Sequence, residues 1–141
     1  MVIMTVWFKR SIDFTMKNSH VLSWILRIVV AAILLQTLYF KFTAHPDSVY
    51  IFTKLGAEPY GRIGLGIVEL ITSCLILIPR TKIIGTVLSF GIMCGAILAH
   101  LLVIGVQIKG DGGGLLTLAA IVFVSCALLL ILHRKEIRFR T

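Results

Sequence analysis

The chain has 141 residues, of which 58% are hydrophobic and 14% are charged. A water-soluble domain of this length could not bury that share of apolar side chains in one core, so lipid must be the solvent. The formal net charge of +8 does not indicate a nucleic-acid partner, because the basic residues lie between apolar runs and at the chain ends. No linker or low-complexity run divides the sequence, which predicts a single domain.

Residues 1–19 are expected to form an N-terminal cytoplasmic or interfacial segment. The run from Met1 to Phe8 is apolar but short, and it has no preceding basic segment and no small-x-small cleavage site, so we do not expect a cleaved signal peptide. Charged and apolar residues are mixed after it, as in a segment lying at the membrane surface. These residues are Lys9, Arg10, Ile12, Asp13, Phe14, Met16 and Lys17. A frayed tail is the alternative, and the sequence leaves both open.

Four apolar stretches are long enough to cross a bilayer. Each crossing needs about 20 mostly apolar residues, because a helix rises about 1.5 Å per residue and the hydrocarbon core is about 30 Å thick. The stretches cover residues 21–40, 60–78, 83–106 and 115–132. The sequence therefore predicts an all-α fold, an integral membrane four-helix bundle over residues 20–133, with a basic cytoplasmic tail over residues 134–141.

The distribution of lysine and arginine predicts which side of the membrane each loop faces. Four spans place both termini on one side, together with the short connection between the second and third spans. Nine basic residues lie on that side: Lys9, Arg10, Lys17, Arg80, Lys82, Arg134, Lys135, Arg138 and Arg140. The two opposite loops hold four: Lys41, Lys54, Arg62 and Lys109. We therefore expect a multi-pass protein of the cell (inner) membrane with cytoplasmic N- and C-termini.

A short amphipathic helix is predicted in the first outer loop. Residues 45–47 are typical of a helix start, with proline at the first helical position and an acid in the first turn, and Gly56 is typical of a helix end. One face of this helix would carry Val49, Phe52 and Leu55. We expect it to lie across the outer surface as a lid. The second outer loop, residues 109–114, is glycine-rich and is expected to be a flexible connector.

Polar residues in the outer halves of the spans are the candidate site. Ionisable groups at membrane depth are costly unless they are paired or wetted, so each is a functional hypothesis. Glu69 follows Arg62 by two helical turns, about 10 Å below the outer edge of the second span, and His100 lies at a comparable depth in the third. Gln36 and Lys41 belong to the first span. We expect Gln36, Lys41, Glu69 and His100 to converge on one outward-facing cavity, where pairing can offset desolvation of the carboxylate.

Each of these residues also has a structural interpretation. Lys41 could extend its ammonium group to the interface, and Arg27, inside the first span, could bond phosphates or helix-end carbonyls. His100 alone could donate to a backbone carbonyl in a satisfied interior. Glu69 favours an internal polar site most strongly, because an acid in mid-span has no short route to water.

Metal binding and dithiol chemistry are not expected. One Glu and one His fall short of the three or four ligands that a zinc or iron centre needs. The cysteines Cys74, Cys94 and Cys126 are single residues in three spans without a vicinal pair, which favours a packing role. In the third span Gly91, Gly95 and Ala99 recur every four residues, which predicts a groove where another membrane helix can approach closely.

The order of these features resembles the DoxX-like family. The residues concerned are Arg27, the run Tyr39-Phe40-Lys41, the segment Gly66-Ile-Val-Glu69-Leu-Ile, the basic turn at Arg80 and the glycine-rich third span reaching Ala99-His100-Leu101. The family usually has a glycine shortly before the lysine of the first span, where this chain has Thr37 and Leu38.

The resemblance covers about residues 20–133 and implies a four-helix membrane bundle related in architecture to sterol-isomerase-like and sigma-receptor-like proteins. It implies several functions: thiosulfate oxidation with quinones, membrane-bound oxidative-stress complexes, or assembly of receptor channels. Fold analogy alone does not choose between activities.

Three hypotheses follow. The first is a binding or accessory protein of a redox system, whose cavity holds a small lipophilic molecule such as a quinone. The second is an enzyme in which Glu69 and His100 transfer protons. The third is an assembly or interaction protein that uses the groove at Gly91, Gly95 and Ala99 and the lid helix to hold a larger membrane partner or a second copy.

Overall fold

The computed structural model describes residues 1–138, except for the side chains of residues 12–17. The elements are α1 (Val2–Phe42), α2 (Pro46–Lys54), α3 (Tyr60–Leu77), α4 (Lys82–Ala99), the π-helix η1 (His100–Ile104), α5 (Gly114–Leu132) and α6 (Arg134–Arg138). In this part of the chain, four segments are long and apolar enough to cross a membrane: Asn18–Phe42, Tyr60–Leu77, Lys82–Ile104 and Gly114–Leu132. The predicted all-α membrane bundle is therefore confirmed.

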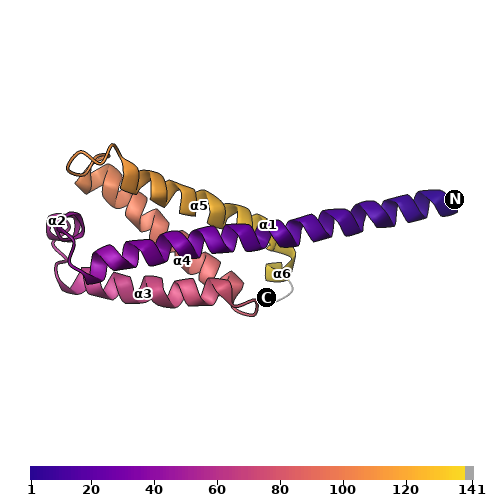
Figure 1. Cartoon of the computed structure of the whole chain (residues 1–141), viewed down its shortest axis with the longest axis horizontal. Helices are drawn as coiled ribbons and strands as arrows, with labels where there is room; N and C mark the ends of the chain where they lie inside the picture. The colour runs from indigo at the N-terminus through magenta and orange to yellow at the C-terminus, as the bar shows by residue number, and fades with distance from the viewer. Residues whose placement is uncertain (139–141) are drawn as a thin grey trace.

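The four long helices enclose one core (Figure 1). α1 packs against α3 and α5, and α4 packs against the same two helices, so α1 and α4 are diagonal neighbours. Phe90 of α4 stacks on Phe123 of α5 with ring centroids 4.7 Å apart. The buried core consists of Val30, Ala31, Leu34, Ile76, Met93, Ala119, Val122, Cys126 and Leu129. In the text below, the end of the bundle that carries α2 is called the outer end.

Two arginines join α1 and α3 at opposite ends. Arg27 is 3% exposed and donates to the carbonyl oxygen of Ile76 at 2.6 Å and to that of Leu77, where α3 ends. Arg62, at the start of α3, donates to the carbonyl oxygen of Lys41 in the last turn of α1. The last carbonyls of a helix lack internal partners and carry the negative end of its dipole, so each guanidinium satisfies them. Of the two structural roles predicted for Arg27, the helix-end carbonyls are the one observed.

α3 and α4 touch near their short connection and separate toward the outer end (Figure 1). The contact depends on Gly85, because a Cβ added there would lie 2.4 Å from the backbone nitrogen of Ile76. Further along α4, Gly91 and Gly95 make no such close contact, because nothing lies within 4 Å of the Cβ position at either residue. At these two glycines, no helix of the described chain fills the predicted groove.

The predicted short helix of the first outer loop is present as α2, which lies over the outer end of the bundle (Figure 1). Its apolar residue Phe52 is 7% exposed. Two lysines hold the helix to the second outer loop and to η1. Lys54 Nζ donates to the carbonyl oxygen of Ile104 at 3.1 Å, and Lys109 Nζ donates to that of Pro46 at 3.3 Å. These bonds place α2 as a cover over the space beneath it.

Residues 2–19 belong to the same helix as the first span, and their predicted cytoplasmic or interfacial placement stays a prediction. α1 is one helix of 41 residues, and its first part projects beyond the bundle in line with the span (Figure 1). The sequence has no proline or glycine before Pro46, so nothing breaks the helix where the span begins. The side chains of Trp7 and Phe8 are exposed there. The predictions that fall outside the described residues concern Ile12, Asp13, Phe14, Met16 and Lys17, whose side chains are not described, and Arg140.

Candidate functional site

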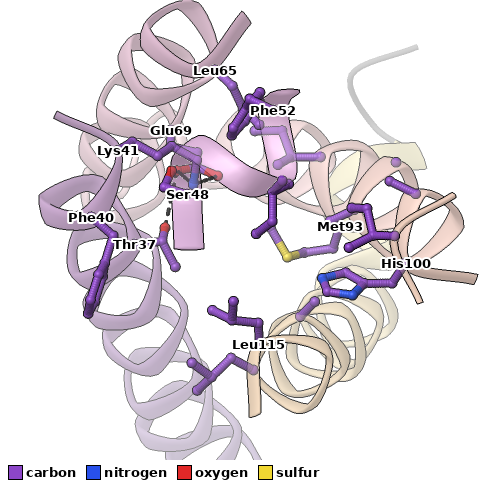
Figure 2. Close-up of a pocket in the computed structure, with 18 of the residues that line it drawn as sticks. Thr37, Phe40, Lys41, Ser48, Phe52, Leu65, Glu69, Met93, His100 and Leu115 are labelled. Carbon is purple, nitrogen blue, oxygen red and sulfur yellow. Dashed lines mark hydrogen bonds and ion pairs between the residues drawn. The ribbon is translucent and has the colours of Figure 1, made fainter. Parts of the chain in front are cut away.

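A cavity of about 450 Å³ lies in the outer half of the bundle, beneath α2 (Figure 2). Most of its lining is apolar: Ile33, Leu34, Phe40, Ile51, Phe52, Leu55, Leu65, Ile92, Met93, Ile104, Leu115 and Leu118. Its polar lining consists of Thr37, Lys41, Asp47, Ser48, Glu69, His100 and Asp111. An apolar space of this size with a few convergent polar groups is typical of small-molecule sites, which range over about 300–1,000 Å³.

The charged centre of the cavity is an ion pair between α1 and α3. Lys41 Nζ lies 2.8 Å from Glu69 Oε2 and 3.1 Å from Oε1. The two side chains are 12% and 3% exposed. Thr37 Oγ lies 3.1 Å from Glu69 Oε2 and 2.9 Å from the carbonyl oxygen of Leu34, so its single proton can serve only one of them at a time. The carboxylate is thus compensated mainly by the ammonium group.

The opposite wall carries His100, which is 5% exposed and begins η1 (Figure 2). Its Nδ1 lies 2.9 Å from the carbonyl oxygen of Gly105. A carbonyl can only accept, so Nδ1 carries the proton of this bond. Nε2 is left without a hydrogen-bond partner in the described part of the chain, and the ring points into the cavity (Figure 2). A neutral ring therefore offers a lone pair to an occupant, and a protonated ring offers a donor.

The π-helix explains where the third span ends. Gly105 has a φ of 98° and donates its amide to the carbonyl oxygen of His100 at 2.8 Å. The helix thus stops before Val106, the predicted end, because the wider π turn closes on a glycine at a positive φ that other residues rarely adopt. His100 is fixed to Gly105 by both its backbone and its ring, which orients the imidazole.

Three of the four predicted site residues line the cavity. Lys41 and Glu69 form a pair, whereas among the described contacts no hydrogen bond or ion pair joins Glu69 to His100. Gln36 is exposed and does not line the cavity. Its neighbour Thr37 does, because a step of one residue turns the helix by about 100 degrees. The spacing of four between Thr37 and Lys41 is the signal that could have identified Thr37 from the sequence.

Asp111 organises the second outer loop, where a flexible connector was expected. Its carboxylate accepts from the amides of Ile108 at 2.9 Å, Gly113 at 2.9 Å and Leu115 at 3.1 Å. These backbone bonds, led by the one from Ile108, lower the pKa of the Asp111 carboxyl below its ordinary value of 3.8. These bonds tie the loop backbone to one carboxylate at the rim of the cavity, and the predicted flexibility of the loop stays a prediction.

The cysteines lie outside the cavity lining and are all free: Cys74 is exposed, Cys94 is half-buried and Cys126 is buried. Among the described residues, no group of three or more His, Cys, Asp or Glu side chains is placed to hold a metal ion. The arrangement can therefore offer an occupant an apolar volume, one compensated ion pair and one imidazole nitrogen.

Comparison with known proteins agrees with this architecture. A sequence profile of the DoxX-like family matches residues 25–128, which include all four spans in whole or in large part. No curated protein and no solved structure matches the chain. The profile match covers most of the sequence and accords with the four apolar helices. The chain is a multi-pass membrane protein and belongs to the DoxX-like family.

Proposed function

We propose that the protein binds a small, largely apolar molecule with an uncharged polar head in the outer cavity, as an accessory component of a membrane redox system. The observation that carries the proposal is the buried Lys41–Glu69 pair facing the free Nε2 of His100 across an apolar space of about 450 Å³. A purely structural bundle would be expected to fill such a space with side chains, because helices associate in lipid through close packing.

The polar groups favour an uncharged head. The ammonium of Lys41 and the carboxylate of Glu69 neutralise each other, so an ionic ligand would face a net-neutral site and would lose its hydration without compensation. Two of the three N–H groups of Lys41 point to Glu69, which leaves one donor for a ligand oxygen. Quinones and quinols carry oxygens at both ends of one ring, and they therefore suit polar groups on two opposite walls.

The predicted topology places this cavity in the outer leaflet. With nine basic residues on the side of the termini and four on the other, both termini are proposed to be cytoplasmic and the α2 side external. A single cysteine introduced at Thr53, which is exposed on α2, should react with a membrane-impermeant maleimide on intact cells. A cysteine at exposed Lys135 should react only after lysis, and the opposite pattern would contradict the orientation.

The binding test uses purified protein in nanodiscs and decylubiquinone, in its oxidised and reduced forms, as the probe. His100→Ala removes Nε2, and Glu69→Gln removes the ion pair. Each is expected to weaken binding by about 5- to 140-fold, because losing one buried hydrogen-bond partner costs about 1–3 kcal/mol and about 1.4 kcal/mol is tenfold.

Gln36→Ala is the matched control. Gln36 lies on the same helix as Lys41, about 7.5 Å along its axis, but is exposed and outside the cavity lining, so its removal should leave the affinity unchanged. If wild-type protein binds neither form of the probe and retains no small molecule in native mass spectrometry, the cavity is structural. Equal effects of all three substitutions would also count against the proposed site.

A further inference from the structure

The lining of the cavity continues around α4 onto its membrane-facing side. Ala96 lines the cavity within the bundle, and Ile92, Gly95 and Gly91 line it as well. At about 100 degrees per residue, Gly95 lies about 100 degrees around the helix from Ala96, and Gly91 about 140 degrees in the same sense. Both glycines are exposed. The cavity therefore extends outward along the side of α4 that is turned away from the core.

Open space at the two glycines marks where this extension leaves the bundle. A Cβ at Gly85 would collide with α3, whereas a Cβ at Gly91 or Gly95 would meet nothing within 4 Å. Beyond the contact at Gly85, α3 and α4 diverge toward the outer end of the bundle (Figure 1). Two residues without side chains, one turn apart, leave a shallow channel on the exposed surface of α4 that is continuous with the cavity lining.

Polar groups at the inner end of this channel point to the kind of occupant. His100 is 5% exposed, its Nε2 has no partner among the described residues, and its ring points into the cavity (Figure 2). The Lys41–Glu69 pair lies on the other wall. One continuous surface therefore offers hydrogen-bonding groups at one end and exposed glycines facing hydrocarbon at the other.

We propose that the cavity opens sideways into the lipid between α3 and α4, and that its occupant is a single-chain amphiphile. Its uncharged head lies between Lys41–Glu69 and His100, and its apolar chain leaves over Gly95 and Gly91. This inference rests on the proposed function and adds the class of ligand and its route.

The route under α2 is the less favourable one. Lys54 bonds the carbonyl oxygen of Ile104, Lys109 bonds that of Pro46, and the Phe52 side chain is buried beneath the helix. Access from the aqueous side would have to break these contacts, and an apolar molecule is scarce in that phase. Access from the lipid requires no rearrangement at Gly91 and Gly95, because both positions are already open.

The test compares two probes and two substitutions at one residue. The probes are decylubiquinone, which carries a ten-carbon chain, and the same benzoquinone head without the chain. Gly95→Leu places a branched side chain in the channel, and Gly95→Ala adds one methyl group in open space. We expect Gly95→Leu to weaken binding of the chain-bearing probe at least tenfold and to leave the head-only probe unchanged. Gly95→Ala should bind both probes as the wild type does.

Controls separate blocking from misfolding. Val124→Leu adds bulk to an exposed position of α5 that does not line the cavity, and it should bind both probes normally. Gly91→Leu serves as a second blocking variant if Gly95→Leu fails to fold, as judged by thermal unfolding. A bifunctional probe with a photoreactive group at the chain end should crosslink to the lipid-facing side of α4 near Leu88 or Leu98.

Normal binding of the chain-bearing probe to both folded leucine variants would overturn the lateral route while leaving the proposed function intact. Crosslinks confined to α2, or a stoichiometric second copy in native mass spectrometry that Gly95→Leu abolishes, would also overturn it. If neither probe binds to the wild-type protein, the proposed function on which the inference rests is refuted instead.

Discussion

Replacing Lys41 by methionine tests the energetic role of the buried ion pair. Methionine keeps the length and apolar stem of the side chain but removes the charge. Glu69, 3% exposed, would then retain only the hydroxyl of Thr37, which also faces the carbonyl oxygen of Leu34. Breaking a buried pair by removing one partner costs about 3–5 kcal/mol, because the remaining charge is left uncompensated. We expect Lys41→Met to lower the free energy of unfolding by about that amount.

Removing the charge of Glu69 should cost less stability than removing that of Lys41. Removing both charges should restore part of the stability that Lys41→Met loses. In Glu69→Gln the amide can still bond Thr37, and Lys41, already 12% exposed at the end of α1, can turn its ammonium toward water. A cost of about 1–3 kcal/mol is expected for this variant. In the double variant Lys41→Met/Glu69→Gln no buried charge remains, so its stability should exceed that of Lys41→Met alone.

The assay is reversible unfolding in mixed micelles. A fluorogenic maleimide monitors the unfolding, because it reacts with Cys126 when the core opens. Cys126 is 0% exposed in the folded protein, and Cys74 and Cys94 are replaced by serine to remove the exposed and the half-buried thiol. Lys135→Met is the control, because this exposed residue should change stability by less than about 0.5 kcal/mol. Equal costs for Lys41→Met and Lys135→Met, or a double variant weaker than Lys41→Met, would refute the reasoning.

Three further predictions concern the frame around the cavity. Arg27→Met should destabilise the bundle by about 1.5–3 kcal/mol for each lost charge-assisted bond to a carbonyl. Arg27→Lys cannot span both carbonyls, so it should retain only part of the wild-type stability. Full wild-type stability of Arg27→Lys in the same unfolding assay would contradict the two-carbonyl role. Gly85→Ala should be strongly destabilising, since its Cβ would lie 2.4 Å from a backbone nitrogen. Gly91→Ala places its methyl group in open space and should gain up to about 1 kcal/mol of stability from helix propensity. Similar shifts of melting temperature for both variants would count against the packing described. The Asp111 carboxyl has a lowered pKa, so its contribution to folding stability is fully present above about pH 4 and is lost as pH falls through the folded-state pKa. The difference in stability between wild type and Asp111→Asn should therefore shrink below about pH 4. A difference that stays constant with pH would argue against the bonds from the loop amides to Asp111.

The helices themselves could be predicted from local sequence. A run of apolar residues long enough to cross a bilayer forms an α-helix in lipid, because every N–H and C=O must be bonded within the segment. The signals at His45, Pro46 and Gly56 likewise located α2, since caps and breakers act within a few residues. The depth of Glu69 and His100 followed from counting turns along one helix at a time.

Relations between helices could not be obtained in this way. Depth along a span says nothing of rotation about its axis, so Gln36 was placed in the cavity although Thr37 faces it. The spacing of Gly91 and Gly95 predicted a groove for a membrane helix but not which helix, and within the described chain the close contact of α4 is made at Gly85 instead.

The sequence by itself determined the number, length and apolar character of the spans, because these depend on each segment's contact with lipid and on its own hydrogen bonds. The tertiary structure decided that Lys41 pairs with Glu69, that Nε2 of His100 is left for an occupant, and that α3 and α4 separate beyond Gly85. Those outcomes depend on how four helices rotate and tilt to pack against one another, and packing is a property of pairs of surfaces rather than of any one segment.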